Sequence, residues 1–320
     1  MYSLGIDTSC YTTSVAVVDR NRKLIFEDRR LLAVPPGERG LQQSQAVFQH
    51  VQNLPIILEN VFNSVGAEKI AMITASTAPR PTKGSYMPVF TVSQGQGKIL
   101  ASALDVPFIA ATHQEGHLEA ALWSTDTQIP RQFLAVHLSG GTSELLLVSG
   151  NPDGYAIKLL GGTIDLHAGQ FVDRIGVALG FGFPAGAALE TLARQSVKRL
   201  GLATAVKGYE FSFSGPESQA QRLIAQGAPA ADVARSVEQC IATTLEKVLR
   251  RAIEKEGIKE VLLAGGVAAN GYIRKRLMKR LHHPAVGASL VFAKPDYSTD
   301  NAVGVALLGL KQYYSNISLK

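Results

Sequence analysis

Several features that mark particular protein classes are scarce in this sequence. Only 2 of its 320 residues are cysteine, which excludes a disulfide-stapled scaffold and suggests a reducing compartment. Charged residues make up only 18%, while 30 residues are glycine, a composition that favours tight turns over a helical solenoid. No apolar run reaches the roughly 18 residues of a membrane helix, and the N-terminus lacks a signal-peptide pattern. We therefore expect a cytoplasmic protein without a membrane segment.

The length and net charge of the chain indicate its number of lobes and the kind of partner it could bind. A chain of 320 residues is long enough to form two lobes. It carries 32 lysines and arginines against 26 acidic residues, a net charge of +6. This excess allows an anionic partner such as nucleic acid.

The predicted secondary structure contains a repeated opening. Residues 4–7 and 13–19 predict two strands around a small polar turn, and residues 133–138 and 144–148 repeat this plan. Apolar spacing predicts a helix over residues 41–66, with a kink or break at Pro55. We therefore expect a duplicated α/β architecture. Its predicted N-terminal lobe is 1–130 and its C-terminal lobe 131–299, with the final helix, about 300–320, packing back on the first lobe.

Two histidines four residues apart are the strongest local signal for a metal. On a helix, His113 and His117 would lie on one face, close enough to share a divalent ion, although an exposed pair is the alternative. Glu115 lies at the wrong position for the general base of a zincin. Asp300 could supply an oxygen ligand or simply cap the final helix. His137, at the end of a strand, is either a core residue or a further ligand.

Two glycine turns predict a nucleotide site. The turns at 139–142 and 265–270 each follow an apolar strand and could offer backbone N–H groups to phosphates. Asp173 and Glu190 could accept hydrogen bonds from ribose hydroxyls, or could be solvated surface groups. The basic stretch at 272–283 could contact phosphates, or could be an exposed helix face.

Taken together, these motifs resemble the TsaD/Kae/Gcp family, formerly labelled O-sialoglycoprotein endopeptidase. Eight segments match in order over nearly the whole chain. They are Gly5-Ile6-Asp7-Thr8-Ser9-Cys10, His113-Gln114-Glu115-Gly116-His117, Leu138-Ser139-Gly140-Gly141, Ala168-Gly169-Gln170-Phe171-Val172-Asp173, Phe183-Pro184-Ala185-Gly186, Phe211-Ser212-Phe213-Ser214-Gly215, Ala264-Gly265-Gly266-Val267-Ala268-Ala269-Asn270 and Thr299-Asp300-Asn301-Ala302.

The resemblance implies a fold, an activity and a set of site residues. The fold is the duplicated actin/hexokinase/sugar-kinase-type ATPase fold, with two lobes around a nucleotide cleft. The activity is transfer of a threonylcarbamoyl group from threonylcarbamoyl-adenylate to the tRNA adenosine next to the anticodon. The implied ligands of one iron or zinc ion are His113, His117, Asp300 and His137, which occupies the position of a tyrosine ligand in archaeal relatives. The residues implied for binding the adenine nucleotide (threonylcarbamoyl-AMP, AMP or ATP) are His137, Leu138, Ser139, Gly140, Gly141, Asp173, Gly186, Glu190 and Asn270.

Some positions depart from the family pattern. Tyr11 and Thr12 replace an acidic pair, Thr142 follows the Ser-Gly-Gly segment, and Pro216-Glu217 replaces a stretch with a basic residue. These departures suggest a divergent paralogue. They leave open a related carbamoyltransferase that acts on a small molecule or protein, as in the HypF and TobZ relatives, and a non-catalytic nucleotide-binding subunit. Within the family, the partners to expect besides tRNA are TsaB-like and TsaE-like proteins.

Overall fold

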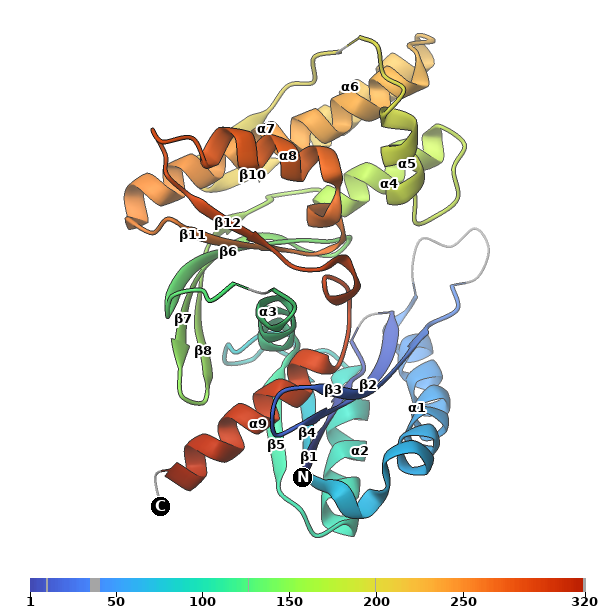
Figure 1. Cartoon of the computed structure of the whole chain (residues 1–320). Helices are drawn as coiled ribbons and strands as arrows, with labels where there is room; N and C mark the ends of the chain where they lie inside the picture. Colours follow the sequence, from blue (N-terminus) through green and yellow to red (C-terminus); the bar gives the residue numbers. More distant parts are fainter. Residues whose placement is uncertain (10, 35–40, 126, 199, 319–320) are drawn as a thin grey trace. The chain divides into compact units, whose positions relative to one another are not determined.

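The computed structural model describes residues 1–9, 11–34, 41–125, 127–198 and 200–318 (Figure 1). Of the two cysteines, Cys240 is buried, whereas Cys10 lies outside the described residues. The chain divides into two compact units. The first comprises Met1–Asp126, Gly150–Ala156 and Thr299–Lys320, and the second comprises Thr127–Ser149 and Ile157–Ser298.

The sheet of the first unit has five strands in the order β3-β2-β1-β4-β5. The repeated strand pair of the sequence appears here as antiparallel β1 and β2, while β4 and β5 continue the sheet in parallel. The strands are β1 (Tyr2–Asp7), β2 (Thr12–Asp19), β3 (Leu24–Leu31), β4 (Ile70–Ala78) and β5 (Phe108–Thr112).

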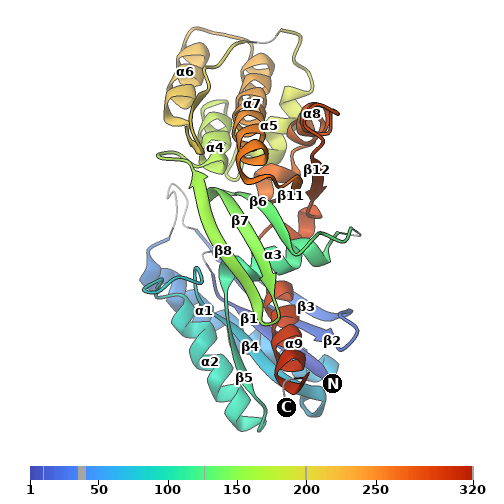
Figure 2. The same ribbon diagram turned by 90° about the vertical axis from the view of Figure 1, so that its left-hand side faces the viewer.

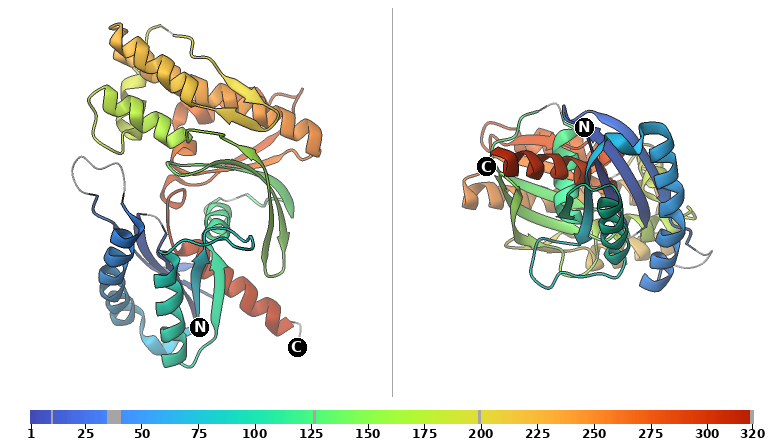
Figure 3. Two further views of the ribbon diagram at one scale, coloured as in Figure 1. Left: turned by 180° about the vertical axis from the view of Figure 1, so that it is seen from behind. Right: turned by 90° about the horizontal axis from the view of Figure 1, so that it is seen from below.

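Helices cover both faces of this sheet, because successive residues of β1 point to opposite sides. Leu4 and Ile6 pack in the core with α1 and α2, which run side by side (Figure 3). Ser3 and Gly5 instead meet Ala306 of α9. The helices are α1 (Gln43–Val65), α2 (Phe90–Ala103), α3 (His113–Trp123) and α9 (Val303–Ser318), with a short 3₁₀ turn η1 (Ala67–Lys69).

Helix α1 continues through Pro55, so of the two alternatives that the sequence suggested at this residue the break is wrong, and the kink stays a prediction. Its buried residues before and after the proline, Leu54, Ile57 and Leu58, all belong to the sheet-facing core. Burial of this continuous apolar face offsets the hydrogen bond that the proline removes.

The sheet of the second unit repeats the order of the first, as β12-β11-β6-β7-β8 (Figure 2). An antiparallel pair, β6 and β7, is again continued by parallel strands, here β11 and β12. This shared pairing pattern is what a duplicated α/β architecture predicts. The strands are β6 (Gln132–Leu138), β7 (Ser143–Asn151), β8 (Gly154–Gly162), β11 (Glu260–Ala264) and β12 (Ser289–Phe292).

The long helix α7 lies at the centre of the second unit's core. Its apolar residues pack with those of β6, β11 and the neighbouring helices. The remaining elements are α4 (Ala168–Ala178), α5 (Gly186–Ala193), α6 (Ser214–Ala225), α7 (Ala230–Glu256), α8 (Gly271–Leu281), β9 (Ala205–Lys207), β10 (Glu210–Ser212), η2 (Gly266–Ala269) and η3 (Pro295–Tyr297).

The segment of residues 150–156, which comprises the end of β7, the start of β8 and the turn between them, belongs to the first unit. Its Tyr155 hydroxyl donates a hydrogen bond to the buried Glu119 of α3, which also pairs with Arg22 at 2.6 Å. Lys311 of α9 donates to the carbonyl of Gly154 at 3.0 Å. These contacts fix the turn against the helix that carries the paired histidines. None of the helices in the described part of the chain could span a membrane.

Candidate metal and nucleotide sites

Three side chains of the first unit each direct a ligand atom to one point. The Nε2 atoms of His113 and His117 are 2.9 Å apart, and Oδ1 of Asp300 lies 3.5 and 3.2 Å from them, respectively. Two ligands held about 2.1 Å from one zinc or iron ion are about 3.0–3.4 Å apart in octahedral or tetrahedral geometry. The three separations therefore fit a single ion.

The start of α3 explains how both histidines reach this point. Thr112 caps the helix by accepting from the backbone N–H of Glu115 at 3.3 Å, and the Glu115 carboxylate accepts from the backbone N–H of Thr112 at 3.2 Å. This reciprocal capping fixes the first turn, so His113 and His117 lie one above the other. It also gives Glu115 a structural role, in agreement with its unsuitable position for a zincin base.

Side chains other than that of Asp300 accept hydrogen bonds from the backbone at the start of α9. The backbone N–H of Val303 at the start of α9 donates to the side chain of Asn301 at 3.1 Å, and that of Ala302 donates to Ser14 Oγ at 2.9 Å. Asn301 thus supplies the acceptor at the helix start. The Asp300 carboxylate instead faces the two histidines.

The electrostatics of this cluster favour one shared positive charge. Burial alone would lower the pKa of His113, but Asp7 and Asp300 raise it to about 10. Burial and the neighbouring positive His113 lower the pKa of His117. Hydrogen bonds from both imidazoles outweigh burial and hold the pKa of Asp300 far below its usual range. A bound cation would take the place of the shared proton.

In the second unit, the two glycine turns lie side by side at the carboxyl ends of β6 and β11. The strands are parallel, with His137 opposite Ala264. Gly265 has a φ of +96°, and a Cβ there would lie 2.1 Å from the carbonyl oxygen of Leu138. A Cβ at Gly140 or Gly141 would meet no described atom within 4 Å. Gly265 is thus required by packing, whereas the space at the Ser139-Gly140-Gly141 turn is open to a ligand.

The polar residues predicted for the nucleotide lie on three neighbouring elements: Asp173 on α4, Glu190 on α5, and Asn270 just before α8. The backbone N–H of Ala185, just before α5, donates to Asp173 at 2.8 Å. Glu190 accepts from the backbone N–H of Gly271 at 3.2 Å, next to Asn270. Gly186 begins α5. The structure therefore brings Glu190 and Asn270 together and places Asp173 beside the entrance to α5.

His137 lies in the second unit, on β6, half-buried and paired in register with Glu144. Its role as a metal ligand stays a prediction.

Three arginines of the basic helix α8 make contacts within the protein. Arg274 donates to the carbonyls of Ala268 and Ala293, both at 2.8 Å, and Arg276 and Arg280 pair with Glu246.

Sequence reasoning missed two residues that contact the predicted sites. Asp7 accepts a hydrogen bond from Nδ1 of His113 at 2.8 Å, and Glu238 accepts one from the side chain of Asn270 at 2.6 Å. Asp7 was visible only as part of a matching segment, and Glu238 belongs to no motif.

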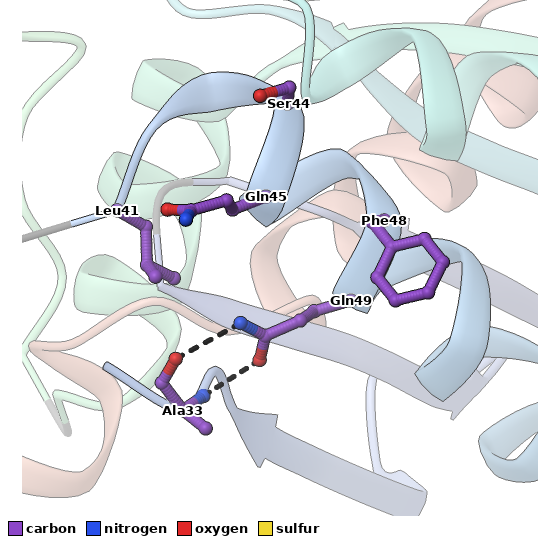
Figure 4. A pocket seen from close by; sticks show the side chains of 6 residues that line it. All are labelled: Ala33, Leu41, Ser44, Gln45, Phe48 and Gln49. Carbon is purple, nitrogen blue, oxygen red and sulfur yellow. Dashed lines mark hydrogen bonds between the residues drawn. The ribbon is translucent and has the colours of Figure 1, made fainter. Parts of the chain in front are cut away.

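A separate surface pocket beside α1 includes none of the predicted site residues (Figure 4). There Gln49 donates to and accepts from the backbone of Ala33, and the lining is Ala33, Leu41, Ser44, Gln45, Phe48 and Gln49.

Comparisons with known proteins agree with these motifs. A family model described as tRNA N6-adenosine threonylcarbamoyltransferase matches residues 35–307. Proteins with that name from Archaeoglobus fulgidus and Thermus thermophilus are 30% and 31% identical to this chain. Each match covers 98% of this chain, and 92% and 93% of the respective relatives.

Solved structures with low sequence identity show the fold. An activator of 2-hydroxyisocaproyl-CoA dehydratase from Clostridium difficile aligns with a TM-score of 0.57 at 12% identity, over 100% of this chain and 98% of that one. A ROK-family glucokinase from Streptomyces griseus aligns with a TM-score of 0.53 at 12% identity, over 97% and 99%. The predicted α/β fold of the actin/hexokinase type is therefore confirmed.

Proposed function

Because the chain belongs to the tRNA N6-adenosine threonylcarbamoyltransferase family, we propose that it transfers a threonylcarbamoyl group from threonylcarbamoyl-adenylate to the adenosine beside the anticodon of tRNA. The observation that carries this proposal is the convergence of His113, His117 and Asp300 on one point. The fold alone does not require such a cluster, so its presence supports this family's activity beyond a general ATPase-like fold.

The donor set suits a divalent transition metal. Two imidazoles and one carboxylate are ligands that both zinc and non-haem iron accept, and their separations fit one ion. We propose His137 as a fourth ligand, on the strength of the family resemblance. When bound, the ion would supply Lewis-acid polarisation of a carbonyl or carboxylate oxygen of the donor.

In this proposal the second unit holds the adenylate. The open turn at Ser139, Gly140 and Gly141 would take the phosphate with backbone N–H groups, since a Cβ at either glycine would occupy free space. Asp173 and Glu190 would accept hydrogen bonds from the ribose hydroxyls. Leu138, Gly186 and Asn270 would complete the nucleotide contacts.

The reaction itself is an acyl transfer from a mixed anhydride. The exocyclic amine of the adenosine forms a bond to the carbamoyl carbon, and the bond from that carbon to the phosphate oxygen breaks. AMP leaves with the electron pair, and the amine loses a proton. The contribution of the chain is to bind both substrates and orient the carbonyl, and an anticodon loop presents its bases unpaired for such an attack.

We further propose TsaB-like and TsaE-like protein partners and a cytoplasmic location. A relative from Thermoplasma volcanium, described as a probable bifunctional tRNA threonylcarbamoyladenosine biosynthesis protein, is 28% identical to this chain. This chain covers 58% of that relative, which therefore contains sequence that this chain lacks.

The proposal is tested in a strain whose other family members are deleted or depleted. Nucleosides from its digested tRNA are analysed by mass spectrometry with wild type, His113→Ala/His117→Ala or the exposed-residue control His283→Ala. Threonylcarbamoyladenosine should persist with wild type and with His283→Ala and disappear with the double variant. If folded, metal-loaded wild type gives none, even with TsaB-like and TsaE-like proteins supplied, the tRNA acceptor is wrong. A small-molecule or protein acceptor then takes its place.

A further inference from the structure

The carboxylate of Asp7 lies behind the candidate metal site, at the end of β1. Asp7 is almost completely buried, with 1% of its surface exposed. Its Oδ2 is 2.8 Å from Nδ1 of His113 on α3. These two residues are 106 positions apart in the sequence, so only the folded first unit brings them together.

Asp7 cannot itself bind the ion that His113 would hold. The Nδ1 and Nε2 atoms lie on opposite sides of an imidazole ring, and Nε2 is the atom that faces His117 and Asp300. A carboxylate oxygen accepts hydrogen bonds, so Nδ1 of His113 must donate. This arrangement leaves the lone pair of Nε2 directed at the predicted ion.

The Asp7 carboxylate is held in turn by two serines. Its Oδ1 accepts from the backbone N–H of Ser9 at 3.1 Å and from the hydroxyl of Ser76 at 2.7 Å. Its Oδ2 accepts from the hydroxyl of Ser9 at 3.1 Å. The loop after β1 and the strand β4 therefore hold the carboxylate in place independently of its contact with the histidine.

We propose that Asp7 is a positioning residue that fixes the tautomer and ring orientation of His113 for metal binding. The inference rests on the proposed metal site, and it assigns a role to a residue outside the ligand set. Outer carboxylates that accept from a ligand histidine also raise its basicity, and their loss typically costs about 10–100-fold in metal affinity.

The contacts of Asp7 predict the effect of a near-isosteric change. In Asp7→Asn, the amide oxygen would have to take the place of Oδ1, because the backbone N–H of Ser9 contacts that position and can only donate. The amide NH₂ would then face Nδ1 of His113. Nδ1 would have to accept, so the proton would move to Nε2 and block the lone pair that points at His117 and Asp300.

The test measures metal affinity rather than catalysis. Purified metal-free protein is titrated with Zn²⁺ or Co²⁺ against a competing chelator, and Co²⁺ absorption reports the coordination. Asp7→Asn should bind about 10–100-fold more weakly than wild type. Asp7→Glu should retain most of the affinity, because it keeps a carboxylate. Glu119→Gln, which removes another buried carboxylate from α3, should lower thermal stability with little change in affinity.

A double variant separates positioning from a general structural effect. If Asp7 acts through His113, then Asp7→Asn should cause no further loss of affinity in a His113→Ala background. Equal affinities of wild type and folded Asp7→Asn would overturn the inference, as would an additive loss in the double variant. If wild type binds neither ion, the proposed metal site itself is wrong.

A measurement on the unaltered protein covers the case in which Asp7→Asn does not fold. Long-range ¹H–¹⁵N spectra of the zinc-loaded, histidine-labelled wild type should show His113 protonated at Nδ1. A His113 that is protonated at Nε2, or bound to zinc through Nδ1, contradicts the inference.

Discussion

The side-chain amide of Asn270 donates a hydrogen bond to Oε1 of Glu238 at 2.6 Å, while its oxygen caps α8 by accepting from the backbone N–H of Ile273 at 3.0 Å. Glu238 is buried on α7 and pairs with Arg235 at 2.5 Å through its other oxygen. Burial raises the pKa of Glu238, and the hydrogen bond from Asn270 and the charge of Arg235 oppose that shift. Both ends of the Asn270 amide are therefore fixed before any nucleotide binds.

We predict that Glu238→Leu weakens adenine nucleotide binding about tenfold, because a hydrogen bond to a charged group contributes about 1.5–3 kcal/mol. Calorimetric titration with AMP and a non-hydrolysable ATP analogue measures this effect. The matched control is Glu246→Leu on the same helix, which removes the partner of Arg276 and Arg280. The control should lower the melting temperature but leave nucleotide affinity unchanged. Equal losses of affinity in both variants would show that Glu238 acts only through stability.

The glycines of the two turns should respond differently to alanine. Gly141→Ala should fold normally, since its Cβ would meet no described atom within 4 Å, but it should weaken nucleotide binding by filling the proposed phosphate space. Gly265→Ala should destabilise the second unit severely, because it combines a left-handed φ of +96° with a clash at Leu138. Thermal unfolding and nucleotide titration of both variants provide the comparison. Unchanged nucleotide affinity in Gly141→Ala would place the phosphate elsewhere.

Local patterns in the sequence predicted the elements that depend on local chemistry. The strand pairs, the glycine turns and the four-residue spacing of His113 and His117 follow from side-chain alternation, turn residues and helix geometry. For Asp300 the residues alone left a metal ligand and a helix cap as alternatives, and only the family resemblance favoured the ligand, because no spacing rule relates Asp300 to the distant histidines. The sequence also could not predict that Asn301 accepts the hydrogen bond at the start of α9, since several neighbouring polar residues could cap this helix.

Contacts between distant segments account for what the sequence left out. Asp7 and His113 meet because β1 and α3 belong to one unit, and Tyr155 reaches Glu119 because the turn after β7 joins that unit. The break at Pro55, one of the two alternatives predicted there, is wrong for the same reason. Packing of α1 against the sheet overrides a local preference that the sequence alone displays.

We predict that acid destabilises the first unit through His50, a buried histidine whose Nδ1 lies 2.8 Å from the hydroxyl of Thr13. Burial lowers the pKa of His50 to about 4 from 6.5, although Asp7 and Asp300 oppose the shift. The unfolded chain therefore binds a proton at higher pH than the folded chain. Stability should fall as the pH drops from about 6.5 to about 4, by at most about 3 kcal/mol.

Denaturant unfolding of wild type and His50→Leu between pH 4 and 8 isolates this effect. The difference between the two stability curves should change across the window and become flat above about pH 7. A difference that is constant over the whole range would mean that His50 has the same pKa in the folded and the unfolded protein, which contradicts the prediction.

The close approach of α3 and α9 gives the last prediction. A Cβ at Gly304 would lie 1.8 Å from the carbonyl oxygen of Gly116, which is the residue before His117. Backbone atoms cannot yield cheaply, so Gly304→Ala must displace α9 from α3. Because α3 carries both histidines and Asp300 lies just before α9, this displacement should separate the three ligands. We expect a loss of stability of about 1–3 kcal/mol, together with a loss of metal affinity.

The matched control for this change is Gly95→Ala on the outer part of α2, where a Cβ would meet no described atom within 4 Å. It should leave stability and metal affinity at or above the wild-type values, because alanine is the better helix former. Thermal unfolding of the metal-free proteins and chelator competition with Zn²⁺ measure the two effects separately. If Gly304→Ala is destabilised but binds Zn²⁺ as wild type does, the ligands keep their geometry independently of the packing between the two helices.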